Sequence, residues 1–332
     1  MKRHKICKII FAILAVFLCV AFYELIGICV TYKKQPAVSD ATIKETQNIM
    51  SVAGRENTER AVIIEKNSQA LLERVRLIQN AKDEIILSTF AFKSDESGKL
   101  ILGALHDAAD RGVHVRILVD GMESWIDMEG NPYFYGLSSH ENVEIKLYNK
   151  ANPLKPWKTM GRMHDKYLIA DGKIYILGGR NTYNYFLGDF PGHKNFDRDV
   201  LVVCDEPQKD NSVNQLWNYF ETIWEQEDCR YFHNSKKLAD RQSVKKAVLE
   251  LQEGYQQYFE VNKEKICDTD YADETFETEK IILLSNPIHT QAKEPVVWYQ
   301  LGELMKNAKE RVKIHTPYII CNDMMYNTWE EI

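Results

Sequence analysis

The sequence lacks an excess of basic residues. Among its 332 residues, 48 are acidic and 42 are lysine or arginine, so the formal net charge is −6. Proteins that bind the nucleic-acid backbone usually carry a basic excess, because neutralising phosphates supplies much of their affinity. The charge balance therefore disfavours a nuclease, although a local basic pocket is compatible with it. No segment has the low complexity typical of disorder, and the chain is long enough for one large or two small cores.

Metal-binding patterns are absent as well. The sequence contains no C-x2-C, no H-E-x-x-H and no acidic pair with a histidine at ligand spacing. His106 and His114 have no partner at useful spacing, so we expect structural roles for both. No cysteine spacing requires a disulfide. The cysteines lie in or beside the apolar N-terminal run, or are scattered beyond it: Cys7, Cys19, Cys29, Cys204, Cys229, Cys267 and Cys321. We expect neither a metal nor another cofactor.

The N-terminus contains a long hydrophobic run. Basic residues precede an uncharged stretch at 9–23, and residues 25–30 extend it past Glu24. A run of about 22 such residues can cross a bilayer as a helix. A cleaved signal peptide is the alternative, but no A-x-A-like site follows promptly. We expect residues 1–34 to form a single-pass anchor in the cell membrane. Because more basic residues precede the run than follow it, we expect a cytoplasmic N-terminus and an extracytoplasmic domain.

Residues 35–66 are polar and are expected to form a linker. The first folded domain is expected to cover 67–265, with a helix capped by Asn67 or Ser68 at its start. A strand, helix, strand order implies a right-handed parallel unit with polar loops at the strand carboxyl ends, so the fold class is α/β. Hydrophobic periodicity predicts strands at 84–90, 114–119, 143–148 and 200–204, and helices at 98–111, 211–226 and 244–258.

Reactive side chains gather at residues 163–181. The stretch predicts an approach loop, a strand at 167–170, a turn, and a second strand at 173–177. Because side chains alternate along an extended chain, His164 and Lys166 should point the same way and place an imidazole and an ammonium in one site.

The end of the same stretch adds groups that suit an anion. Gly178 and Gly179 let the backbone approach a ligand, and Asn181 can donate an amide N–H to a phosphate oxygen. A surface His-x-Lys pair alone would mean little, but the further fixed positions favour a site. The set suits phosphoryl transfer through a covalent phosphohistidine.

These residues match a known signature. The chain resembles the phospholipase D superfamily, whose motif H-x-K-x4-D-x6-G-[GS]-x-N is present at His164, Lys166, Asp171, Gly178, Gly179 and Asn181. The runs GGRNTYNYFLGDF and FDRDVLVV are most similar to the bacterial cardiolipin synthase branch, so the resemblance covers about 68–332. It implies half of a phospholipase D-like α-β-α sandwich. In the family, two such halves meet about a pseudo-twofold axis, and each contributes one motif to a shared site.

The resemblance also implies residue roles. His164 would be the nucleophile, Lys166 and Asn181, with Gly179, would bind phosphate, and Asp171 would give structural or hydrogen-bonding support. An acidic residue after the motif hydrogen-bonds the nucleophilic histidine in the family. Asp197 is the first choice for this residue and Asp199 the second, and a surface aspartate before a strand is the alternative. An acidic partner agrees with the need to fix the imidazole tautomer. The aromatic residues Tyr183, Tyr185 and Phe186 could line a channel or simply pack in the core.

A second copy of the first α/β repeat begins near the C-terminus. Residues 77–89 align with 304–316 at a constant shift of 227, and the apolar positions keep step. Four pairs are identical: Asn80 and Asn307, Ala81 and Ala308, Lys82 and Lys309, Thr89 and Thr316. We expect 266–332 to be the start of an incomplete second repeat. Its own His-x-Lys would then lie in a missing C-terminal half, or, alternatively, two chains would pair their single motifs.

Together these features predict a membrane-anchored phosphatidyltransferase of the cardiolipin synthase kind. It would move a phosphatidyl group between phosphatidylglycerol molecules, without nucleic acid as a partner. Two alternatives remain from the residues alone. One is a phosphodiester hydrolase, either a phospholipase or a nuclease. The other is a membrane-tethered fragment that binds phosphate without turnover.

Overall fold

The structure, a computed structural model, describes residues 2–51, 59–152, 154–233, 235–316 and 318–332. They divide into two compact units. The sheet unit comprises Glu56–Ala151 and Arg162–Ile282. The helical unit comprises Met1–Arg55, Asn152–Gly161 and Leu283–Ile332.

A mixed nine-stranded sheet forms the centre of the sheet unit, in the order β8-β4-β3-β2-β5-β6-β7-β1-β9. Strands β2, β3 and β4 run parallel, and the other pairings are antiparallel. The strands are β1 Glu59–Ile64, β2 Glu84–Thr89, β3 His114–Asp120, β4 Val143–Tyr148, β5 Tyr167–Ala170, β6 Ile174–Gly178, β7 Asp199–Cys204, β8 Cys229–Tyr231 and β9 Phe276–Glu277.

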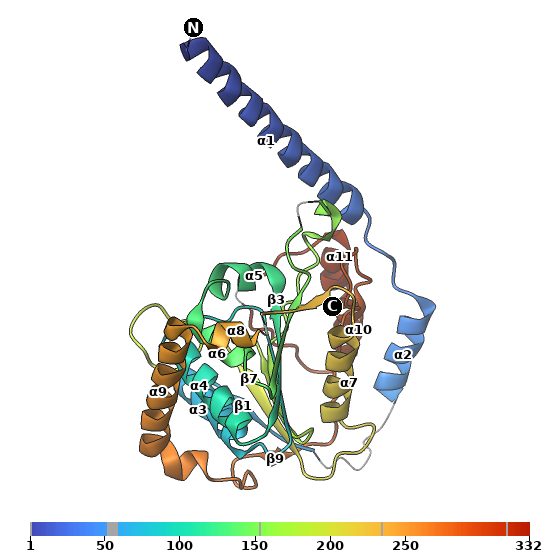
Figure 1. Cartoon of the computed structure of the whole chain (residues 1–332). Helices are drawn as coiled ribbons and strands as arrows, with labels where there is room; N and C mark the ends of the chain where they lie inside the picture. Colours follow the sequence, from blue (N-terminus) through green and yellow to red (C-terminus); the bar gives the residue numbers. More distant parts are fainter. Residues whose placement is uncertain (1, 52–58, 153, 234, 317) are drawn as a thin grey trace. The chain divides into compact units, whose positions relative to one another are not determined.

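Helices cover both faces of this sheet, which confirms the predicted α/β sandwich. Figure 1 shows α3, α4, α6 and α9 on one face and α7 on the other. The helices of the sheet unit are α3 Asn67–Asn80, α4 Glu96–Asp110, α5 Gly121–Asp127, α6 Pro132–Ser138, α7 Ser212–Trp224, α8 Lys236–Ala239 and α9 Gln242–Ile266.

Helix α4 illustrates why these segments fold as they do. Asp95 caps its N-terminus by accepting a hydrogen bond from the Gly98 N–H at 3.1 Å. Leu102 and Leu105 are fully buried, and burial stabilises each such side chain by about 2 kcal/mol. A Cβ at Gly103 would lie 2.6 Å from the Leu251 carbonyl oxygen, so glycine allows α4 and α9 to pack closely.

The predicted linker at 35–66 contains two regular elements. Helix α2, Asp40–Ser51, belongs to the helical unit, and β1 belongs to the sheet. Strand β1 pairs with β7, whose residues lie some 140 positions later, so local sequence could not reveal it. The sheet unit therefore begins before Asn67, the predicted start of the domain.

The helical unit contains the apolar N-terminal segment. Its elements are α1 Lys2–Tyr32, α2, the short 3-10 helix η1 Pro156–Lys158, α10 Val296–Lys306 and α11 Asp323–Glu331. Within α1, Lys5–Tyr32 is long and apolar enough to cross a membrane. The helix thus fits the expected membrane anchor.

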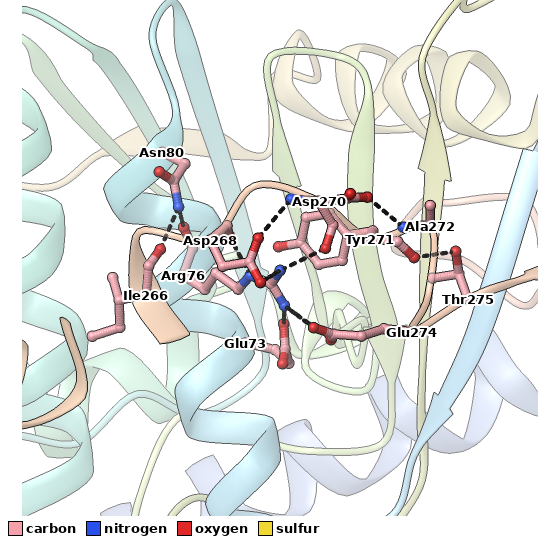
Figure 2. Close-up of polar contacts among 10 residues, drawn as sticks. All are labelled: Glu73, Arg76, Asn80, Ile266, Asp268, Asp270, Tyr271, Ala272, Glu274 and Thr275. Atoms are coloured by element: carbon pink, nitrogen blue, oxygen red, sulfur yellow. Dashed lines mark hydrogen bonds and ion pairs between the residues drawn. The ribbon is translucent and has the colours of Figure 1, made fainter. Parts of the chain in front are cut away.

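The acidic segment after α9 is fixed to α3 by Arg76 (Figure 2). Its guanidinium donates to the carbonyl oxygens of Asp268 at 2.7 Å and Asp270 at 3.1 Å, and Nη1 lies 2.9 Å from a Glu274 oxygen. The Tyr271 ring stacks on the same guanidinium at 3.9 Å. These contacts hold the segment in place from Asp268 to Glu274.

Helix ends in α10 and α11 share features with those of α3 and α4 at the shift of 227 residues. Asn80 and Asn307 each donate to the carbonyl oxygen four residues earlier, at 2.8 Å. Asn322, which lies 227 positions after Asp95, caps α11 by accepting from the backbone N–H three residues later, as Asp95 does in α4. Residues 311–316, equivalent to β2, form no strand. Strand β2 is hydrogen-bonded on both sides by β3 and β5, and no described strand flanks 311–316.

We expect Arg76→Met to destabilise the sheet unit strongly. Glu73 is 5 % exposed and its Oε2 lies 3.5 Å from Arg76, so the substitution would leave a buried carboxylate without its counter-charge. Losing one partner of a buried ion pair costs about 3 kcal/mol. Arg60→Met is the matched control, because Arg60 also holds this loop but its side chain is 30% exposed. Thermal unfolding of the purified chain measures both. Equal effects of the two substitutions would contradict the argument.

Candidate active site

The motif residues emerge at one edge of the sheet. Strand β5 runs antiparallel to β2, with Tyr167 opposite Ser88, so the residues just before β5 lie where β2, β3 and β4 end. The turn between β5 and β6 uses left-handed backbone at Asp171 and Gly172, with φ of 52° and 61°. This hairpin confirms the predicted strand, turn, strand pattern.

His164 and Lys166 share one site, as their spacing predicts. Lys166 Nζ lies 3.2 Å from His164 Nδ1 and donates to the His164 carbonyl oxygen at 2.6 Å. The Phe90 ring packs beside the imidazole with centroids 4.6 Å apart. The imidazole is exposed, whereas Lys166 is 6% exposed.

Electrostatics favours a neutral imidazole. Partial burial of the ring, and then the Lys166 charge, lower the pKa of His164. Burial also lowers the pKa of Lys166 to about 8, although the Asp165 and Asp197 carboxylates act in the opposite direction. A neutral imidazole has a lone pair for attack, and at pH 7 most Lys166 side chains still carry the charge that an anion needs.

Asn181 is held by the loop after β2. Its Oδ1 accepts from the Ala91 N–H at 3.2 Å, so its NH2 group points away from that contact. Thr182 N donates to the Ala91 carbonyl oxygen at 3.1 Å, which ties the two segments together. Phe90, the residue before Ala91, packs against His164, so the same loop contacts both motif residues.

The two glycines of the motif make room for carboxylates. A Cβ at Gly178 would lie 2.0 Å from Asp199 Oδ1, and a Cβ at Gly179 would lie 2.0 Å from Asp197 Oδ2. We predicted that these glycines let a ligand approach, with Gly179 as a phosphate ligand. In the structure an aspartate occupies the space beside each glycine. The missing Cβ therefore makes room for these carboxylates.

The two candidate acidic partners differ sharply in environment. Asp199 is 1% exposed and pairs with Arg74 at 2.9 Å and Arg180 at 3.2 Å. Asp197 is exposed and lies near enough to Lys166 to influence its pKa. No hydrogen bond among the described residues joins either carboxylate to His164. Asp197 therefore keeps its place as first choice, because Asp199 is already engaged by two arginines.

Asp171 lies at the far end of β5 from His164. Its carboxylate accepts hydrogen bonds from the backbone N–H groups of Lys82, Asp83 and Glu84 at 2.8–3.2 Å. It thereby fixes the loop between α3 and β2. The structure does not bring it to His164, and its contacts are those of the structural support that the resemblance implied.

The sequence did not identify the residues that hold the chain next to His164 in place. Asp120 is fully buried, accepts from the Met163 N–H at 3.1 Å and pairs with Arg162 at 3.0 Å. It thus fixes the backbone directly before His164. Tyr219 donates to Asp165 Oδ2 at 2.7 Å, on the opposite side of the chain from His164 and Lys166. The position of Asp120 at the end of a strand was the sequence feature that could have indicated its contact with Met163. No local signal pointed to Tyr219.

Among the residues that the structure describes, no group of three or more His, Cys, Asp or Glu side chains is arranged to hold a metal ion. Lys166 and the Asn181 amide are the groups suited to phosphate oxygens. The arrangement can therefore combine nucleophilic attack by an imidazole with binding of the anion by a cation and an amide.

Comparison with known proteins identifies a family model that covers the motif region. The family model described as the phospholipase D-like domain of cardiolipin synthase matches residues 75–224, which include every motif residue. Cardiolipin synthase C of Escherichia coli is 29% identical over 154 residues, covering 42% of this chain and 31% of that protein. These matches support assigning the chain to the phospholipase D superfamily.

Two further proteins are similar over longer stretches of the chain. An uncharacterized protein of Helicobacter pylori is 27% identical over 292 residues, covering 80% of this chain and 55% of that protein. The crystal structure of Nuc, a phospholipase D family member from Salmonella typhimurium, covers 53% of this chain and 99% of its own, at 18% identity and a TM-score of 0.38. The chain spans about half, or less, of the length of the curated relatives it matches.

We expect Lys166 to titrate about two pH units below an ordinary lysine. Its pKa of about 8, against an ordinary 10.5, means that its charge is present below pH 8 and lost above it. Competitive acetylation followed by mass spectrometry should therefore show half-maximal reactivity of Lys166 near pH 8. Because the Asp197 charge raises this pKa, Asp197→Asn should shift the midpoint lower still. A midpoint near 10.5 would contradict the buried ammonium.

Asn substitutions should distinguish the roles of Asp197 and Asp199. Asp199→Asn removes the counter-charge of two buried arginines and should cost about 3 kcal/mol of stability. Asp197→Asn changes an exposed side chain and should alter stability by less than about 0.5 kcal/mol. If Asp197 orients the nucleophile, its loss should still lower turnover by about 100-fold or more. Thermal unfolding and turnover are measured on both variants. Normal turnover in a folded Asp197→Asn variant would exclude that role.

Proposed function

We propose that the chain acts in a membrane-anchored phospholipase D-type phosphatidyltransferase of the cardiolipin synthase kind. It would transfer a phosphatidyl group from one phosphatidylglycerol to the hydroxyl of another. The observation that carries this proposal is the pairing of His164 and Lys166, whose Nδ1 and Nζ atoms lie 3.2 Å apart. The apolar helix α1 supports a lipid substrate, because an anchor keeps the enzyme at its substrate's surface.

The first chemical step is attack of a histidine nitrogen on phosphorus. His164 Nε2 forms the N–P bond, and the bond from phosphorus to the glycerol oxygen breaks. Attack through Nε2 requires the ring proton on Nδ1. Lys166 now lies 3.2 Å from Nδ1, so it would move from that nitrogen to a phosphate oxygen when substrate binds. Asp197, which already acts on the charge of Lys166, is the carboxylate available to accept from Nδ1–H.

The second step regenerates the imidazole. The hydroxyl of the acceptor attacks phosphorus, its proton leaves to a base, and the N–P bond breaks. The glycerol leaving group of the first step needs a proton, which a second His-x-Lys motif would supply. We propose that this motif comes from a continuation of the repeat that begins at α10. The alternative source is a second copy of the chain.

A phosphodiester hydrolase is the second candidate function. The specific observation in its favour is the exposed imidazole of His164, since water can reach a phosphohistidine formed there. Water would then take the place of the acceptor alcohol in the second step. The substrate of such a hydrolase would be a phospholipid or a nucleic acid.

The orientation of the anchor is also a proposal. Basic residues are more numerous before the apolar run than after it, which favours a cytoplasmic N-terminus and an extracytoplasmic domain.

The test is product analysis with labelled phosphatidylglycerol in vesicles. The full-length protein should yield cardiolipin and glycerol, and His164→Ala should lower product by at least about 1,000-fold because no other nucleophile replaces the ring. His193→Ala is the matched control, since His193 is an exposed histidine that contacts Asn195. Phosphatidic acid as the only product, unchanged by added glycerol, would assign the hydrolase instead. Unchanged lipid, or full product from His164→Ala, would reject both.

A further inference from the structure

Asp165, the residue between the two reactive side chains, is held by a helix on the other side of the chain. Side chains alternate along extended backbone, so Asp165 points away from the side that carries His164 and Lys166. There the hydroxyl of Tyr219 donates to Asp165 Oδ2 at 2.7 Å. Tyr219 lies 54 positions later in the chain, on α7. A helix that contributes no motif residue therefore contacts the centre of the motif.

Packing fixes the position of the Tyr219 hydroxyl. The Tyr219 ring lies edge-on to the Tyr167 ring, with centroids 6.4 Å apart. Phe220, the next residue of α7, is fully buried and packs against the same Tyr167 ring at 6.5 Å. Burial raises the pKa of the Tyr219 hydroxyl, and the negative charge of Asp165 raises it further. The hydroxyl therefore keeps its proton and remains a donor at neutral and moderately alkaline pH.

The groups that surround Lys166 differ in their effect on its charge. His164 Nδ1 lies 3.2 Å from the ammonium, and the Phe90 ring lies 5.4 Å from it. Neither group supplies a negative charge. Burial lowers the pKa of Lys166 to about 8, and the carboxylates of Asp165 and Asp197 oppose this change. The charge of Lys166 therefore depends on where these two carboxylates are held.

Asp165 is the carboxylate whose place is fixed from another element. The Cα atoms of neighbouring residues are about 3.8 Å apart, so Asp165 stays close to Lys166 although the two side chains point to opposite sides. Lys166 is 6% exposed, so little water screens this interaction. The Asp197 carboxylate is exposed and accepts from the adjacent Arg198 N–H, whereas the Asp165 carboxylate is bonded to α7.

We propose that Tyr219 is a positioning residue of the candidate site. Its hydroxyl holds Asp165 behind Lys166, so that the carboxylate offsets part of the cost of keeping an ammonium in a buried place. Lys166 thereby stays charged, and able to bind a phosphate oxygen, up to a higher pH than burial alone would allow. The inference rests on the proposed anion-binding role of Lys166, and it adds a helix outside the motif to the elements that support this role.

Two substitutions separate the charge from the hydrogen bond. Asp165→Asn removes the charge but keeps an oxygen that can accept from Tyr219, whereas Tyr219→Phe removes the donor and keeps the ring and the charge. Competitive acetylation with mass spectrometry measures the midpoint of Lys166. It should fall by about one pH unit in Asp165→Asn, and by about half a unit in Tyr219→Phe because the released carboxylate turns toward water. The double variant should match Asp165→Asn, since a neutral side chain has no charge to position.

Matched controls remove the same chemical groups elsewhere in the sheet unit. Tyr175→Phe also deletes a buried tyrosine hydroxyl, which contacts Ser212 at the start of α7 at 2.8 Å. Asp83→Asn deletes an exposed carboxylate just before β2. Neither control should move the midpoint of Lys166, and thermal unfolding shows that each variant is folded. An unchanged midpoint in folded Tyr219→Phe, or an equal shift in Tyr175→Phe, would overturn the proposal.

The pH dependence of turnover gives a second measurement. The charge of Lys166 is present below its pKa and lost above it, so wild type and both variants should have similar KM values at pH 6. At pH 8 the KM should rise about fivefold in Asp165→Asn and about twofold in Tyr219→Phe, in proportion to the lost charged fraction. An equal loss at both pH values would assign Tyr219 a merely structural role. The acetylation midpoints need no turnover, so they decide on Tyr219 even if product analysis rejects the phosphatidyltransferase.

Discussion

The candidate site depends on the ion pairs formed by the buried carboxylate of Asp199. It lies between Arg74 of α3 and Arg180 of the motif loop, and all three side chains are almost fully buried. Arg180 also donates to the carbonyl oxygens of Ile64 and Glu65 and to Asn67 Oδ1. One ion cluster thus joins β1, α3, β7 and the motif loop. Buried charges are costly unless their partners are placed well, so the cluster permits few alternative arrangements of these elements.

The residues that would perform chemistry are neighbours of this cluster in sequence. Asn181 follows Arg180, and Asp197 lies two positions before Asp199 and contributes its carbonyl oxygen to Arg180. A second buried carboxylate, Asp120, plays the same part for the loop that leads to His164. Buried ion pairs therefore hold the backbone on either side of the exposed imidazole and the buried lysine. This division agrees with the general need to place reactive groups accurately while leaving them unpaired.

Much of the fold followed from local pattern. The strands at 143–148 and 167–170 lie where alternation and β-branched residues predicted them, and α4 and α7 begin and end within two residues of the predictions. Strand β1 and the loop held by Arg76 did not follow, because both depend on partners far away in sequence. The side-by-side placement of His164 and Lys166 was confirmed, since it needs only extended backbone. The phosphate-binding role of Gly179 stays a prediction, and the side chain that fills the space beside this glycine comes from Asp197.

By itself, the sequence determined the side-by-side placement of His164 and Lys166, the α/β class and the apolar helix, because each rests on spacing between residues near one another along the chain. Only the tertiary structure showed that Asp197 is exposed whereas Asp199 is buried. It also showed that Asp171 binds the backbone before β2 and that His106 pairs with Asp110. Those outcomes depend on burial and on which charges compensate one another across the fold. A side chain's partners in space lie on other strands and helices, and no periodicity along the chain encodes them.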